Sequence, residues 1–117
     1  MKKDNVVQIK SYAFAIRIIN VYKYLCDEKK EFVLSKQLLR CGTSIGANIE
    51  EAIGGQSEKD FYAKLTISYK EARETHYWIR LLKDTNYLDG NEAQSLINDA
   101  DELQRIIGSI QKTLRNS

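Results

Sequence analysis

The segment from Ser35 to Gly55 constrains the fold of this chain more than any other part. Its apolar residues recur at intervals of three and four, which places them on one face of a helix. Gly42 and Gly46 lie one turn apart beside this face, although a glycine in a helix interior costs about 1 kcal/mol relative to alanine. Because glycine has no Cβ, the pair predicts that another backbone approaches this helix closely. The expected packing face consists of Leu38, Cys41, Gly42, Ile45, Ile49, Ala52 and Ile53.

Three further segments have the same helical periodicity, and the chain of 117 residues contains no proline that would interrupt a helix. Short turns separate the four segments, and helices joined by short turns pack antiparallel. No segment alternates apolar and polar residues as a strand would. The sequence therefore predicts one all-α domain over residues 1–117, an antiparallel up-down-up-down four-helix bundle with helices at about 5–29, 35–54, 58–84 and 90–114.

The expected helix ends carry recognisable signals. Ser35 and Ser57 are expected as N-caps of the second and third helices. Asp89 and Glu92 fit a capping box at the start of the fourth helix. The Gly54–Gly55 pair is expected to supply the left-handed residue that ends the second helix.

The first and third helices carry more apolar surface than one bundle can cover. A second apolar side predicts burial against another subunit, so we expect a homo-oligomer. The fourth helix has one apolar stripe and should face away from the interface. The first helix has two apolar stripes, one formed by Ile9, Tyr12, Ile16, Ile19 and Cys26, the other by Val7, Phe14, Ile18, Val21 and Leu25. The candidate interface residues are Phe14, Ile18, Ile67, Trp78 and Leu81.

The sequence offers no constellation for catalysis. A di-metal site in a four-helix bundle needs Glu-x-x-His pairs, but the chain has one histidine, His76, and Arg73 lies three positions before it. There is also no Cys-x-x-Cys, P-loop or dinucleotide fingerprint. We therefore expect no enzyme activity, no cofactor, and neither catalytic nor metal-binding residues.

The two cysteines, Cys26 and Cys41, lie in apolar helical patterns. Free cysteine is among the most buried residue types, so we expect reduced thiols, with a disulfide as the alternative. No basic-then-apolar signal peptide begins the chain, and no apolar run is long enough to span a bilayer. We therefore expect a cytoplasmic protein with no membrane partner.

One stripe of the third helix combines arginine, histidine and tyrosine: Tyr62, Thr66, Tyr69, Arg73, His76 and Arg80. Such a stripe predicts a nucleic-acid surface, with arginines for phosphates and tyrosines for stacking. Lys36 and Arg40 of the second helix would extend it if the bundle places them nearby. The alternative is a solvated or interfacial polar face.

The distribution of charge bears on the same hypothesis. The net charge of +2 does not by itself imply a polyanionic partner. Residues 1–84 hold 15 Lys and Arg against 11 Asp and Glu, while residues 85–117 hold 3 against 5, so we expect a basic face mainly from the first three helices. We expect Glu50, Glu51, Glu71 and Glu74 to pair with arginines such as Arg40, Arg73 and Arg80, and Asn48 to fix helix register.

The run QLLRCGTSIGANIEEA, residues 37–52, resembles the signature of the four-helix bundle proteins encoded in intervening sequences of bacterial 23S rRNA, often labelled S23 ribosomal proteins. Ala52 stands where that family often has glycine, which we expect to be a packing variation. The resemblance covers nearly the whole chain. It continues through Gly54, Ser57, Phe61, Tyr62, the run ISYKEA at residues 67–72, Glu74, Trp78 and the turn at residues 86–88.

The resemblance implies an antiparallel bundle that assembles into a ring, a pentamer. It also implies kinship with the accessory variability proteins of diversity-generating retroelements, which bind nucleic acid and a reverse transcriptase through a positively charged pentameric barrel. Arg40, Asn48, Glu51, Glu71 and Glu74 are family positions by this resemblance, which assigns them no ligand.

The leading hypothesis is a non-enzymatic, oligomeric protein that binds RNA or DNA through phosphates with low sequence specificity. The alternative is a structural or adaptor ring that binds a protein partner, such as a reverse transcriptase, and has no nucleic-acid role. The candidate nucleic-acid-binding residues are Lys36, Arg40, Tyr62, Tyr69, Arg73, His76 and Arg80.

Overall fold

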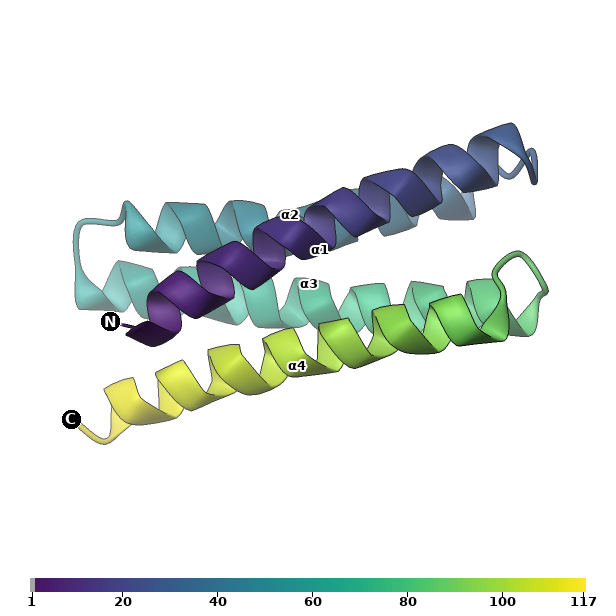
Figure 1. Cartoon of the computed structure of the whole chain (residues 1–117). Helices are drawn as coiled ribbons and strands as arrows, with labels where there is room; N and C mark the ends of the chain where they lie inside the picture. The colour runs from purple at the N-terminus through teal and green to yellow at the C-terminus, as the bar shows by residue number, and fades with distance from the viewer. Residues whose placement is uncertain (1) are drawn as a thin grey trace.

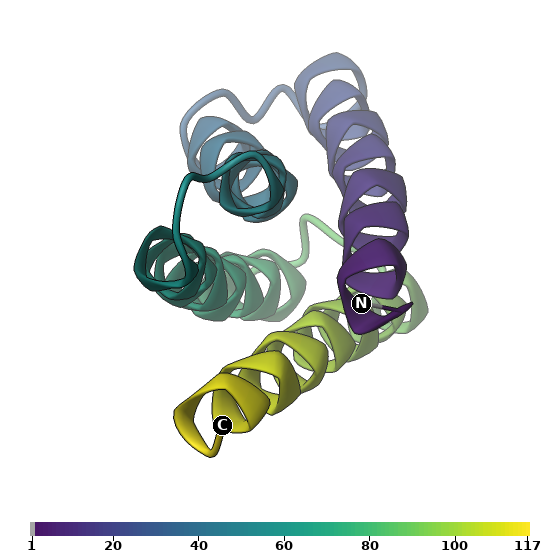
Figure 2. The same cartoon turned by 90° about the vertical axis from the view of Figure 1, so that its left-hand side faces the viewer.

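The computed structural model describes the backbone of residues 2–117 and the side chains of residues 6–117. It contains the helices α1 (Lys2–Asp27), α2 (Leu34–Ile53), α3 (Glu58–Asp84) and α4 (Gly90–Arg115), and no strand in this described part. Successive helices run in opposite directions, and the view along the bundle places them at four corners (Figures 1 and 2). The prediction of an all-α chain is confirmed, and the arrangement agrees with an up-down-up-down bundle.

The four seams between helices are unequal. α2 packs extensively on both α1 and α3, and α3 packs on α4, whereas α1 touches α4 least. Figure 1 shows α1 and α4 diverging toward the end of the bundle that carries the α1–α2 and α3–α4 turns. The bundle is therefore closed along three seams and partly open along the fourth.

All four helices contribute fully buried side chains to one core. Gly42 and Gly46 lie where α1 crosses α2. A Cβ at Gly46 would lie 3.3 Å from the Ser11 carbonyl oxygen, which confirms the predicted close backbone approach; at Gly42 it would lie 2.8 Å from two side-chain carbons of Ile18. The largest fully buried side chains are Phe14, Ile18, Leu25, Leu38, Ile45, Ile49, Leu65, Ile79, Leu82, Leu96, Leu103 and Ile107.

The start of α2 differs from the prediction, because Ser35 lies inside the helix and Glu31 caps it. The Glu31 carboxylate accepts hydrogen bonds from the backbone N–H groups of Ser35 at 2.7 Å, Leu34 at 3.0 Å and Val33 at 3.2 Å. The Ser35 hydroxyl donates back to the Glu31 carbonyl at 2.8 Å. Burial alone would raise the pKa of Glu31, but the hydrogen bonds from these N–H donors outweigh it, and the pKa is lowered.

The other helix ends follow the predictions in part. Ser57 caps α3 by accepting from the Asp60 N–H at 3.0 Å. Asp89 caps α4, accepting from two N–H groups, but the Glu92 carboxylate bonds Arg17 instead of completing the capping box. The prediction for the Gly54–Gly55 pair is wrong: no glycine has a positive φ, and Gly54 lies at φ −82°.

None of the described helices combines the length and apolar character needed to cross a membrane.

Candidate nucleic-acid interface

The predicted stripe on α3 lies along the seam with α4. Five polar contacts join the two helices along its length, one of them from Gln111 Nε2 to the Tyr62 carbonyl at 3.4 Å, and the α4 partners recur at helical spacing. This arrangement brings the C-terminal half of α4 beside the N-terminal half of α3. The other contacts are Arg115 Nη1 to Tyr62 OH at 2.6 Å, Gln111 Nε2 to Thr66 Oγ1 at 2.7 Å, Gln104 Nε2 to the Tyr69 carbonyl at 3.5 Å, and His76 Nε2 to Asp101 Oδ1 at 3.3 Å.

The aromatic members of the stripe serve mainly the seam itself. Tyr69 is half-buried and packs against the core, with its ring over Gly108 of α4. The Tyr62 hydroxyl holds Arg115. His76 accepts from Arg80 Nε at Nδ1, 3.0 Å away, which places its ring proton on Nε2, facing Asp101. The stacking role predicted for Tyr62 and Tyr69 is therefore weakened, because packing and hydrogen bonds already hold these side chains.

Exposed cations flank the seam on both helices. Arg73 follows Tyr69 by one turn of α3, and Arg105 follows Asp101 by one turn of α4. Arg73, Arg105 and Lys112 are exposed, and among the described residues none of them forms an ion pair. We call the cations on this side of the molecule the α3–α4 basic face; they are Arg73, Arg80, Arg105, Lys112 and Arg115.

Few carboxylates oppose this face. Asp101 lies within it and is engaged by His76. Glu58 lies one turn before Tyr62, at the start of α3, and Asp84 lies one turn beyond Arg80, at its end. The acidic residues of α4 all precede residue 103, so the half of α4 that supplies the cations carries none. The prediction of a basic face mainly from the first three helices omits this contribution, because the net charge of residues 85–117 hides the separation of acids and bases along α4.

Lys36 and Arg40 lie apart from the basic face. The Arg40 guanidinium contacts the Glu74 carboxylate, and its Nη1 lies 3.5 Å from Glu71 Oε2, on the seam between α2 and α3. Lys36 is exposed on α2. Figure 2 shows α2 on one side of α3 and α4 on the other. The structure therefore does not join these two residues to the α3 stripe.

The predicted subunit interface needs correction on α1. Phe14 is 2% exposed and Ile18 is 0% exposed, so both lie in the core and cannot meet another subunit. Periodicity shows that α1 has two apolar stripes but does not say which of them the bundle covers. The exposed stripe, which we call the α1 apolar face, is the other one: Ile9 and Tyr12, each 68% exposed, Ile16, 48% exposed, and Ile19, 39% exposed.

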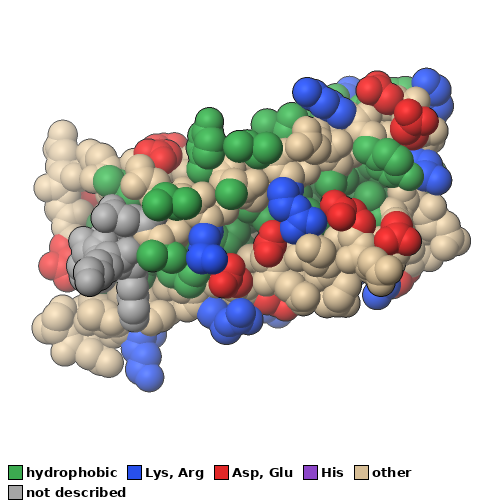
Figure 3. Space-filling view, viewed as in Figure 1, with side chains coloured by type: hydrophobic (Ala, Val, Ile, Leu, Met, Phe, Trp, Pro, Cys, Tyr) green, Lys and Arg blue, Asp and Glu red, His purple; other side chains and the backbone are tan. Residues whose placement is uncertain are grey.

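Figure 3 shows apolar side chains in a row on the side of the molecule where α1 runs. The second predicted patch is smaller. Ile67 is 41% exposed, whereas Leu81 and Trp78 are half-buried and Trp78 packs against the core.

The model of the 23S rRNA-intervening sequence protein family matches residues 3–109. The chain belongs to this family. It is also similar to a crystal structure from Bacteroides thetaiotaomicron, described as a protein with unknown function from the S23 ribosomal protein family. The two are 55% identical, with a TM-score of 0.93 over 94% of this chain and 98% of that chain. No curated protein matches.

The family resemblance predicted from the sequence is thus confirmed, and several of its polar positions meet on the α2–α3 seam. Arg40 bridges Glu71 and Glu74, and Trp78 Nε1 donates to Glu74 at 2.9 Å. Burial and the Glu74 charge raise the pKa of Glu71, and Arg40 opposes them. Asn48 donates to the Ser44 carbonyl of its own helix at 2.8 Å, so this bond does not fix register with another helix.

The other predicted glutamate contacts are with residues other than arginine. Lys64 Nζ lies 2.7 Å from Glu51 Oε1, and Gln8 donates to Glu50 at 3.0 Å. Both cysteines are free thiols; Cys41 is buried and burial raises its pKa to about 11. Among the residues whose side chains are described, no group of three or more His, Cys, Asp and Glu is placed to hold a metal ion.

Proposed function

We propose that this protein is a non-enzymatic, self-associating protein of the 23S rRNA-intervening sequence family that binds nucleic acid through the α3–α4 basic face. One observation carries the proposal: Arg73, Arg105 and Lys112 are exposed and lack a carboxylate partner in the described structure. Cations that the protein does not neutralise are available to phosphates, and their binding releases condensed counterions.

The geometry of this face favours contact with the backbone of RNA or DNA over reading of bases. Tyr62 and Tyr69 are held in the seam, so they offer little area for stacking. Tyr77 is the exposed ring nearby, and the Arg80 guanidinium lies 5.8 Å from its centroid. Contacts dominated by phosphates position a protein on nucleic acid but carry little sequence information, so low sequence specificity follows.

Several cations on the other helix seams are paired with acids. Arg17 Nη1 lies 2.7 Å from Asp99, and Lys10 Nζ lies 3.2 Å from Glu102, both across the α1–α4 seam. Arg40 is similarly paired. Other exposed lysines, such as Lys29 and Lys36, also lack an ion pair with the described residues. The α3–α4 basic face is favoured because its five cations lie on one side of the molecule with few acids among them.

The α1 apolar face supports self-association. Four large apolar side chains in one row on an exposed helix are unusual for a monomer and typical of an interaction surface. Exposed apolar side chains also lie away from α1, among them Ile67 on α3 and the pair Phe32 and Val33 before α2. Contacts between two unlike faces repeat head to tail and close into a ring when the rotation allows. We therefore propose a cyclic homo-oligomer, and the family resemblance implies five subunits.

A mobility-shift titration at low and moderate salt, with structured RNA and duplex DNA, tests nucleic-acid binding. We expect both to bind at low salt and both complexes to weaken steeply with salt. The double variant Arg105→Ala/Lys112→Ala should bind more weakly. The matched control Lys29→Ala/Lys36→Ala, which removes two exposed lysines outside the face, should bind like the unmodified protein. Absence of binding at low salt, or an equal loss of affinity in the two double variants, would overturn the proposal.

The second candidate function is an adaptor ring in the cytoplasm that binds a protein such as a reverse transcriptase. The α1 apolar face is the observation that favours it, because a surface of this kind can bind a foreign partner as readily as another copy. The two functions are distinguished by the same titration. An oligomer that binds neither RNA nor DNA at low salt would favour the adaptor.

A further inference from the structure

The divergence of α1 from α4 leaves a cleft of about 440 Å³ at the turn-bearing end of the bundle. Pockets that bind small molecules have volumes of roughly 300 to 1,000 Å³. None of the residues that line the cleft belongs to the α3–α4 basic face, so the cleft is independent of the proposed nucleic-acid contact. It is lined by Arg17, Asn20, Val21, Tyr24, Leu88, Asp89 and Glu92.

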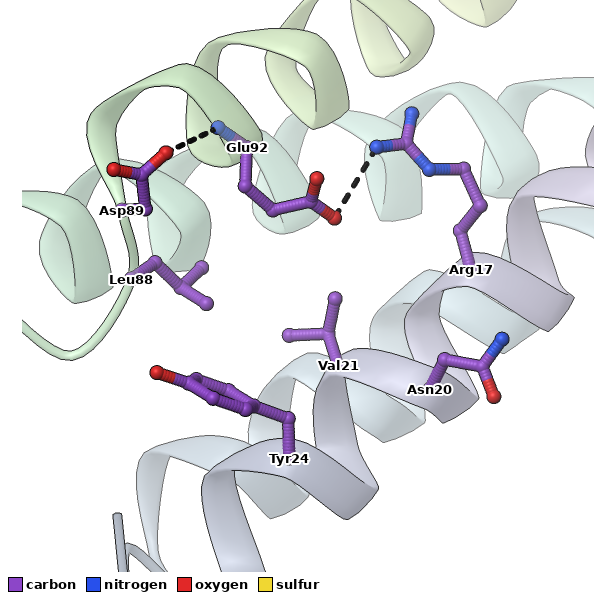
Figure 4. A pocket seen from close by; sticks show the side chains of 7 residues that line it. All are labelled: Arg17, Asn20, Val21, Tyr24, Leu88, Asp89 and Glu92. Atoms are coloured by element: carbon purple, nitrogen blue, oxygen red, sulfur yellow. Dashed lines mark hydrogen bonds and ion pairs between the residues drawn. The ribbon is translucent and has the colours of Figure 1, made fainter. Parts of the chain in front are cut away.

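Apolar side chains form the floor of the cleft. Figure 4 shows Val21 and Tyr24 projecting from α1 toward Leu88, which comes from the turn before α4. Val21 and Leu88 are each 6% exposed, whereas Tyr24 is 41% exposed and presents its ring. The floor can therefore cover a compact apolar or aromatic group with little rearrangement.

The polar rim of the cleft has more acceptors than donors. The Arg17 guanidinium is already shared among Asp99 at 2.7 Å, Ser95 at 3.1 Å and Glu92 at 3.3 Å. Glu92 uses only Oε1 in this contact, and Asp89 uses only Oδ2 to cap α4. The second oxygen of each carboxylate accepts no hydrogen bond from the described residues, so it is open to a donor.

The cleft also offers little to an anion. Although the N-terminus of α4 opens near it, the Asp89 side chain occupies the N–H groups of Asn91 and Glu92. The guanidinium of Arg17 is committed to acidic partners. The local charge therefore favours a cation.

We propose that this cleft binds a small organic ammonium compound with a compact apolar body. The body packs on Val21, Leu88 and the Tyr24 ring, and the ammonium group donates to the free oxygen of Glu92, with the Asp89 carboxylate adding negative charge at the rim. A tyrosine ring beside a cation adds attraction through its π-face. The expected ligands are thus small organic cations that carry an apolar group next to the positive charge.

Titrations followed by 1H–15N correlation NMR test this site with three probes of similar shape: phenethylammonium, neutral 2-phenylethanol and anionic 3-phenylpropionate. We expect phenethylammonium to shift amides at residues 17–24 and 86–92 in a saturable way, the alcohol to bind more weakly, and the anion most weakly. Absence of saturable shifts in these segments at millimolar probe, or equal affinity for all three compounds, would overturn the proposal.

Two variants localise the charge effect. Glu92→Gln should weaken phenethylammonium binding roughly two- to fivefold, the size expected for an exposed ion pair, and leave the alcohol unchanged. Glu102→Gln is the matched control, because Glu102 bridges α1 and α4 through Lys10, outside this cleft. Equal weakening by both substitutions would contradict the assignment. A spectrum that retains the dispersion of the unmodified protein shows that each variant is folded.

Discussion

The cap at the start of α2 gives a quantitative prediction for Glu31→Gln. The substitution replaces a carboxylate that is 9% exposed and that accepts from the N–H groups of Val33, Leu34 and Ser35. A glutamine keeps one acceptor oxygen and turns an NH2 donor toward these donors. Loss of an N-cap costs about 0.5–2 kcal/mol, and hydrogen bonds to a charged acceptor are stronger than neutral ones. We expect the free energy of unfolding to fall by about 2 kcal/mol.

Thermal unfolding followed by circular dichroism at 222 nm at pH 7 measures this loss. For a chain of this length, about 2 kcal/mol corresponds to a lowering of Tm by about 8 °C. Glu28→Gln is the matched control, because Glu28 is an exposed glutamate near the same loop whose side chain makes no hydrogen bond or ion pair with the described residues. It should leave Tm unchanged. Equal Tm values for Glu31→Gln and the unmodified protein would refute the cap.

The same cap predicts a dependence on pH. Because the folded protein lowers the pKa of Glu31, its ionised form stabilises the fold. This contribution is complete above the ordinary glutamate pKa of about 4.3 and is lost as the pH falls through the lowered value in the folded state. The difference in unfolding free energy between the unmodified protein and Glu31→Gln should therefore be constant from pH 8 to pH 6 and shrink below pH 4. A difference that grows with acid would contradict the argument.

Three further predictions address packing, association and reactivity. Gly42→Ala should lower the unfolding free energy by about 1–3 kcal/mol in urea titrations, because the new Cβ would lie 2.8 Å from the branched side chain of buried Ile18. Gly54→Ala is the control and should have little effect, because the nearest atom to a Cβ there is 3.6 Å away. Ile16→Glu on the α1 apolar face should reduce the oligomer mass measured by sedimentation velocity, whereas Val33→Glu, at an exposed loop position, should leave it unchanged. An unmodified protein that is monomeric at micromolar concentration would contradict the proposed assembly. Cys41 should resist alkylation by iodoacetamide at pH 7.5 in the folded protein and react in urea, because burial excludes the reagent and raises the thiol pKa to about 11. Mass spectrometry measures the labelling, and rapid labelling of Cys41 in the folded protein would refute the prediction.

The sequence predicts those features that depend on local pattern. Apolar spacing and the absence of proline lead to four helices, and Gly42 and Gly46 mark the close crossing of α1 and α2. The assignment of Phe14 to the interface fails because two apolar stripes on one helix are equivalent until the other helices are placed. Tertiary packing decides that question.

The candidate site shows the same limit. The α3 stripe is correctly grouped, because residues at helical spacing share a face. The contribution of Arg105 and Lys112 appears only when the basic half of α4 lies beside α3. The predicted pairing of Glu71 and Glu74 with Arg40 is confirmed. The same pairing makes Arg40 a weaker candidate for contact with phosphates than the sequence suggests. Which cations stay unpaired depends on how the helices are placed relative to one another.

The most direct test of the proposed function is the salt dependence of binding to a fluorescently labelled RNA, measured by anisotropy. If each of the five cations on the α3–α4 basic face neutralises one phosphate, the slope of log K against log salt for the unmodified protein should be about −3.5 to −4.5 per subunit. Arg105→Ala/Lys112→Ala should reduce the magnitude of this slope by about 1.5 to 2. A slope that is the same in both proteins would contradict the assignment of the nucleic-acid contact to this face.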